Sequence, residues 1–139
     1  MCIRDSRFTA LLDDADREER AGRPGAALPL LLEAVDLWAG DLAEDLDAEW
    51  LDLERIHLRS RFVRAACRAA QLLVATREPV RAAEVARRAL EVDPWNERSY
   101  LTLADAYDDL GDHTSARAVR KRGEEAIGAP LEPRRAAVT

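Results

Sequence analysis

Few side chains in this sequence have the chemistry of a catalytic or metal-binding group. The 139-residue chain has two histidines, His57 and His113, and two cysteines, Cys2 and Cys67. A zinc site needs several ligands that converge on the metal, and neither histidine has such a set at helical spacing. We therefore expect His57 to be a structural or surface residue and His113 to lie at the start of a helix.

Cys67 lies beside Ala66 on an alanine-rich stripe that also contains Ala70 and Leu73. A free cysteine in such surroundings behaves as a small apolar residue. A thiol nucleophile is activated by a neighbouring base, and no histidine is at helical spacing from Cys67. We predict a buried structural role for Cys67 and, from the absence of a disulfide framework, a reducing cytoplasmic location.

The acidic residues between positions 44 and 49 could suggest a cation site. They lack the glycine and the ligand spacing of a calcium loop. An acidic segment is also favourable just before a helix, because the helix dipole attracts acids to its N-terminus. We interpret the run as a solvated loop that leads into a helix. With no glycine-rich phosphate loop either, the sequence predicts no enzyme, cofactor or metal.

Composition favours a helical protein and disfavours nucleic acid and membrane as its partners. Hydrophobic residues make up 47% of the chain and aromatic residues only 5%, while alanine, the best helix former, is frequent. The net charge is -6, which disfavours binding to a nucleic-acid backbone. No apolar run approaches the ~20 residues that span a bilayer, so no membrane segment is predicted.

Small residues recur with the ~34-residue period of tetratricopeptide repeats, each of which is a pair of helices. One unit begins at Val63 and the next at Glu97, without a gap between them, and a third begins upstream near Phe8. Small residues at these positions allow two helices to approach closely, and a glycine favours the left-handed cap after a helix. The positions predicted to be structural are Ala70, Ala82, Ala89, Pro94, Ala104, Gly111 and Ala116.

The pattern predicts helices at 7–21, 24–38, 47–75, 79–92, 96–110 and 113–127. The expected fold is all-α: a tetratricopeptide-like right-handed array of about six antiparallel helices, in three pairs, one of which has a long helix. Residues 7–127 would form the domain. Residues 128–139 have two prolines and no periodicity, and we expect a loose tail.

Residues 1–6 have a second explanation besides an ordinary disordered N-terminus. Met1 to Ser6 can be encoded by a DNA string that matches the end of a transposase adapter used in sequencing-library preparation. We interpret Met1 to Asp5, and Ser6 with them, as a translated adapter, which would make the chain a fragment of a longer protein.

Two features could bind a partner. Arg117, Arg120, Lys121 and Arg122 form a basic helix end, although cations also suit a helix C-terminus. Tryptophan is enriched at binding hot spots. Trp38, Trp50 and Trp95 each lie at a predicted helix boundary, where packing between helices is the favoured role, and Trp50 is retained as a partner-binding candidate.

Several segments carry a family resemblance through their order and spacing. They are Arg7-Phe8, Ala34–Gly40, Trp50–Arg55, Asp93–Glu97, Ala106–Asp112 and Gly128–Pro133. Together they resemble the bacterial transcriptional activator domain of SARP-type regulators. In the last segment, Pro130 and Leu131 depart from the acidic residues that are usual in that family.

The resemblance implies a domain that follows a DNA-binding winged helix, which this sequence does not contain. It further implies a protein partner: a second copy, RNA polymerase or another domain of the same regulator. Direct, specific DNA binding is not expected of this chain. The alternative is a stand-alone tetratricopeptide scaffold that binds peptides on its concave face.

Overall fold

The computed structural model describes residues 3–38 and 53–131, and every element within these two ranges is a helix. This confirms the predicted all-α class. The helices are α1 (Ile3–Arg20), α2 (Pro24–Leu37), α4 (Leu53–Ala75), α5 (Pro79–Val92), α6 (Glu97–Asp109) and α7 (His113–Ile127).

Most predicted bounds agree with the structure to within one residue. The exception is α1, which begins at Ile3 rather than at Arg7. No glycine or proline separates these two residues, and a helix that has nucleated extends at little cost until a breaker stops it. The predicted start of the long helix at residue 47 lies outside the described residues, and α4 is described from Leu53.

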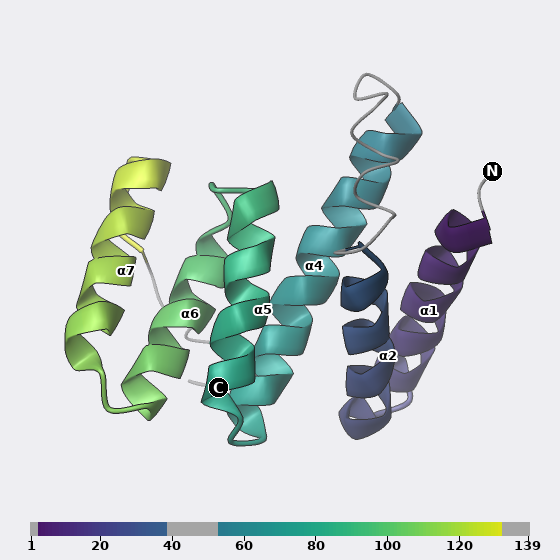
Figure 1. Cartoon of the computed structure of the whole chain (residues 1–139), viewed down its shortest axis with the longest axis horizontal. Coiled ribbons are helices and arrows are strands. Elements are labelled where there is room, and N and C mark those ends of the chain that lie inside the picture. The colour runs from purple at the N-terminus through teal and green to yellow at the C-terminus, as the bar shows by residue number, and fades with distance from the viewer. Residues whose placement is uncertain (1–2, 39–52, 132–139) are drawn as a thin grey trace.

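The helices lie side by side in chain order, from α1 at one end of the molecule to α7 at the other (Figure 1). The most extensive contacts join α1 to α2, α4 to α5 and α6 to α7, so the helices form three pairs. Further contacts join α2 to α4, α5 to α6, and α4 to α6. This arrangement is that of a tetratricopeptide-like array.

The three pairs share the same turn between their helices. In each turn one residue adopts a left-handed conformation: Gly22 (φ 77°), Arg77 (φ 67°) and Gly111 (φ 82°). The next amide then donates to a carbonyl five residues back, which closes a Schellman motif. These bonds run from Arg23 to Glu18 (2.8 Å), from Glu78 to Leu73 (2.8 Å) and from Asp112 to Tyr107 (2.9 Å). Gly111 was predicted from the sequence to lie just after its helix, whereas the conformation of Arg77 was not predicted.

The last two helices begin with side-chain caps. Oδ1 of Asn96 accepts hydrogen bonds from the amide of Ser99 (2.9 Å) and from its hydroxyl (2.8 Å). Asp112 caps α7 in the same way, accepting from the amide and the hydroxyl of Ser115. Each cap satisfies an amide that has no partner within its helix. His113 is the first residue of α7, as predicted.

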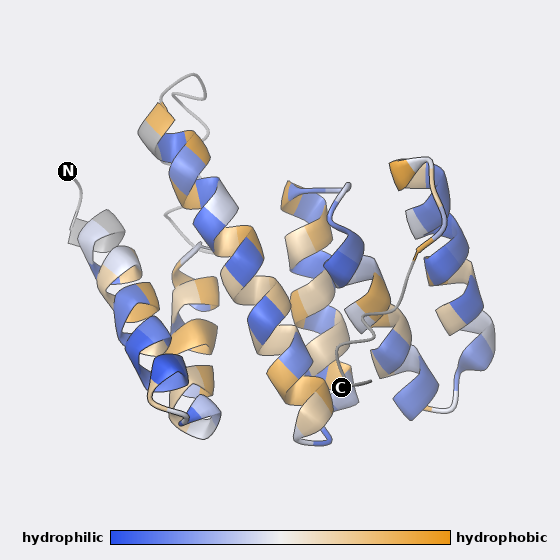
Figure 2. Ribbon diagram, turned by 180° about the vertical axis from the view of Figure 1, so that it is seen from behind, coloured by the Kyte–Doolittle hydropathy of each residue, from blue (hydrophilic) through white to orange (hydrophobic). Residues whose placement is uncertain are grey.

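An aromatic cluster joins the first helix pair to α4. The ring of Trp38, at the end of α2, stacks on Phe62 of α4 with 4.7 Å between centroids, and lies 5.8 Å from the ring of Phe8. Beyond this cluster the core is built mainly of alanine, and the ribbon of α4 alternates between blue and orange along its length (Figure 2). The described helices include none that is both long enough and apolar enough to cross a membrane.

The first residues of the predicted loose tail return along α7. Gly128 ends the helix with a left-handed conformation (φ 79°), and the amide of Leu131 then donates to Oε2 of Glu124 at 3.3 Å. The side chain of Leu131 lies against Gly123 of α7. Residues 132–139 lie outside the described part of the chain.

Candidate protein-interaction surface

The groups with potential chemistry are separated from one another. Cys67 is buried, and burial raises the pKa of its thiol, which therefore stays protonated as a structural residue would. His57 is exposed on α4, and His113 is exposed at the start of α7. Among the residues that the structure describes, no group of three or more His, Cys, Asp or Glu side chains could hold a metal ion.

The basic residues at the end of α7 differ in their surroundings. Arg120 is engaged within the molecule: its Nη2 lies 2.6 Å from Oδ2 of Asp108 and 3.8 Å from Oδ1 of Asp105, both on α6. Arg117, Lys121 and Arg122 are exposed. The pairing of Arg120 was not predicted from the sequence, because its acidic partners lie more than ten residues away in the chain.

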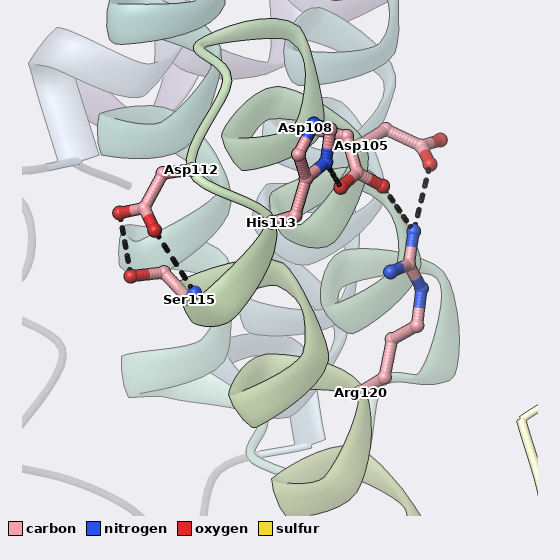
Figure 3. A network of polar contacts seen from close by, with 6 residues as sticks. All are labelled: Asp105, Asp108, Asp112, His113, Ser115 and Arg120. Carbon is pink, nitrogen blue, oxygen red and sulfur yellow. Dashed lines mark hydrogen bonds and ion pairs between the residues drawn. The ribbon is translucent and has the colours of Figure 1, made fainter.

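Figure 3 shows that Arg120 closes a polar network between α6 and α7. Asp108 accepts from Arg120 and also lies 2.7 Å from Nδ1 of His113. These two hydrogen bonds lower the pKa of Asp108, because they favour its charged form. The network therefore ties the last helix to its partner, and the guanidinium group of Arg120 is already paired with acids of α6.

A groove of about 320 Å³ lies between α5, α6 and α7. Its apolar side chains come from all three helices and the turn before α6: Leu90, Pro94, Tyr100, Leu103, Tyr107 and Val119. Arg87, Glu91 and Arg122 supply its charged groups. Arg87 donates to the Tyr107 hydroxyl at 2.7 Å, and the Tyr100 hydroxyl donates to the carbonyl of Pro94 at 2.8 Å. Both tyrosines are thus held in place at the groove.

Trp95 follows Pro94 in the turn between α5 and α6, and 68% of its surface is exposed. Its predicted packing role was wrong, whereas that of Trp38 is confirmed by its stacking in the core. The signal in the sequence was its position: Trp95 lies between two helices, so it belongs to no periodic apolar stripe. Trp50 lies outside the described residues.

The alanines predicted to be structural are all inaccessible to solvent. Each has an exposed fraction of 0%: Ala70, Ala82, Ala89, Ala104 and Ala116. Pro94 is exposed at the groove, and Gly111 has the positive φ of a cap. That the alanines make room for crossing helices stays a prediction, for which the substitutions proposed in the Discussion are the test.

Comparison with protein families identifies the chain. A model of the bacterial transcriptional activator domain matches residues 5–136, nearly the whole sequence. That description names a regulator of transcription rather than an enzyme. Comparisons with curated proteins and with solved structures gave no match. The three helical pairs, the Schellman turns and the family match agree, and the chain belongs to the bacterial transcriptional activator domain family.

Proposed function

We propose that this domain is the protein-interaction part of a bacterial transcription regulator, and that it acts by self-association or by contact with the transcription machinery. The observation that carries the proposal is the groove between α5, α6 and α7, with Trp95 exposed next to it in sequence. The groove offers a partner an apolar surface with charged groups at its edge.

The residues of this groove are of the types that contribute most to protein–protein binding. Hot spots are enriched in tryptophan, tyrosine and arginine, which combine a large apolar area with a polar end. Here Tyr100 and Tyr107 are anchored by hydrogen bonds, and Arg122 lines the same groove. Anchored side chains lose little conformational freedom when a partner binds, which favours affinity.

The basic candidates contribute unequally to this proposal. Arg122 is part of the groove, while Arg117 and Lys121 are exposed elsewhere on α7 and serve as secondary candidates. Arg120 is omitted, because Asp108 already binds it. Trp50 remains a candidate on the basis of residue type alone.

In this proposal, DNA is bound by a winged-helix domain encoded upstream, as the family resemblance implies, and the regulator acts in the cytoplasm. The net charge of -6 supports DNA binding by a separate domain, since an acidic domain is repelled by the phosphates of DNA. Sequencing the source locus upstream of the Arg7 codon tests this part. A winged helix in frame supports it, and a complete short reading frame supports the stand-alone scaffold instead.

Two assays test the groove itself: sedimentation velocity over a range of concentrations for self-association, and a bacterial two-hybrid assay against RNA polymerase subunits. We expect association in at least one, and a loss of at least about tenfold in affinity for Trp95→Ala and Arg122→Glu, the range of hot-spot residues. Arg20→Glu, which makes the same charge change at an exposed site on α1, is the control. Association that is absent, or unchanged in both groove variants, would contradict the proposal.

A further inference from the structure

A second hollow lies between α1, α4 and α6 and has a volume of about 300 Å³. Leu12, Leu31 and Ala65 supply apolar side chains to it, and all three are largely buried. Its polar residues differ in charge from wall to wall, since α1 contributes acids while α4 and α6 contribute arginines. None of the residues that line the groove between α5, α6 and α7 also lines this hollow.

Three arginines of the hollow lie on one face of α4, because Arg61, Arg64 and Arg68 are three and four residues apart. The two outer ones are bound by acids of α1. Arg61 lies 2.9 Å from Asp13, and Arg68 lies 2.7 Å from Glu19. The middle arginine, Arg64, has no acidic partner among the described residues.

Arg98 faces the same hollow from α6, and it too has no acidic partner within the described part of the chain. Both Arg64 and Arg98 are exposed. Four arginines and two acids line the hollow, so its lining is net cationic although the chain as a whole has a net charge of -6. The α4–α6 wall therefore presents two cationic groups to a ligand.

The hollow continues along α4. A neighbouring depression of about 240 Å³ shares Arg64 and Asn96 with it and extends toward Val63 and Val92. Asp93 also lines this depression, but its carboxylate already accepts a hydrogen bond from the amide of Trp95 at 3.0 Å. Together the two depressions form a trough, and a trough suits an extended chain better than a compact ligand.

We infer that this trough binds an extended acidic segment of a protein partner, with its carboxylates on Arg64 and Arg98. The guanidinium group binds a carboxylate through two parallel hydrogen bonds, which gives both strength and orientation. The inference rests on the proposed interaction function and names the chemistry of one partner. Nucleic acid is disfavoured as the occupant, because its backbone carries a charge at every nucleotide and would extend beyond the trough along a chain whose net charge is -6.

Fluorescence polarisation of a short fluorescein-labelled peptide of glutamate, alanine and leucine tests the inference on the full chain. A second peptide with glutamine in place of every glutamate is the uncharged control. We expect the acidic peptide to bind more tightly and to lose affinity as salt rises. Combined Arg64→Glu and Arg98→Glu substitutions should weaken binding at least about tenfold, because each removes a charge-assisted contact.

Arg20→Glu combined with Arg81→Glu gives the same change in net charge at two exposed sites outside the trough and should leave binding unchanged. Circular dichroism melts of both variants establish that they fold. Equal binding of the two peptides, equal losses in the two double variants, or displacement by an oligonucleotide as effective as by unlabelled acidic peptide would overturn the inference. If the acidic peptide does not bind in the trough while Trp95→Ala still weakens association, the inference about the trough is wrong and the proposed function stands.

Discussion

Gly123 of α7 lies directly against Tyr100 of α6. A Cβ atom added to Gly123 would lie 2.8 Å from Cγ and 2.9 Å from Cβ of Tyr100, and 2.9 Å from Cδ1 of Leu131. Real Cβ atoms almost never approach other atoms so closely, and Cβ of Tyr100 moves only with the backbone. The last helix pair is thus held together at a position where only glycine fits.

Gly123→Ala should therefore lower the stability of the domain. Overpacking costs about 1–3 kcal/mol, which outweighs the gain of up to about 1 kcal/mol when alanine replaces glycine within a helix. The matched control is Gly25→Ala in α2, where an added Cβ meets no atom within 4 Å. We expect urea unfolding to show a loss for Gly123→Ala and a small gain for Gly25→Ala. A gain in both would mean that α6 and α7 separate easily.

Arg77→Gly should stabilise the turn between α4 and α5. Arg77 adopts φ 67°, where an L-residue with a side chain is disfavoured by about 1–2 kcal/mol and glycine is not. The greater flexibility of glycine in the unfolded chain offsets part of this, so we expect a net gain of about 0.5–1 kcal/mol. Arg77→Ala keeps the strain while removing the side chain and should be nearly neutral. Thermal unfolding of the three proteins measures the difference.

Acid should destabilise the contact between α6 and α7 through Asp108. Hydrogen bonds from Arg120 and His113 lower the pKa of Asp108 in the folded protein. A lowered pKa stabilises the fold above the unfolded value of about 3.9, and this contribution is lost as pH falls through the folded value. Asp108→Asn should therefore weaken the fold near neutral pH and flatten its pH dependence below pH about 4. Urea unfolding at several pH values tests this, with exposed Asp109→Asn as the control.

The parts of the fold that depend on local pattern could be predicted from the sequence. Ala104 repeats the position of Ala70, and Ala116 that of Ala82, with the ~34-residue period, and Gly111 marks the end of a helix through its own conformational preference. The candidate site was less accessible to prediction. Whether Arg120 is free depends on Asp108, which lies on another helix, and whether Trp95 is exposed depends on how the turn is oriented. Arg77 was missed because the surrounding turn imposes a conformation that its residue type disfavours.

This chain alone should not bind DNA specifically. Its net charge is -6, and its exposed arginines are spread over several helices rather than gathered on one that could enter a groove. A mobility-shift titration at physiological salt should show no complex tighter than about 10⁻⁵ M, which lies in the non-specific range. A sequence-selective shift at nanomolar protein would disprove this prediction.

The final prediction concerns the buried alanines on which the repeat interpretation depends. Ala82 of α5 and Ala104 of α6 have exposed fractions of 0%. If each lies where two helices cross, leucine in its place should overpack the crossing and lower the free energy of unfolding by about 1–3 kcal/mol. Helix propensity alone would treat the same change as nearly neutral, because leucine is almost as good a helix former as alanine.

The controls for this test are the exposed neighbours of the two alanines. Arg81 and Asp105 lie next to them in sequence and make only surface ion pairs, with Glu78 at 3.2 Å and with Arg120 at 3.8 Å. Replacing either with alanine should change stability by no more than about 0.5 kcal/mol, since exposed ion pairs contribute little. Urea unfolding of the four variants gives the comparison. Leucine variants as stable as the parent would show that these alanines are not at helix crossings, because a close crossing has no room for three additional carbon atoms.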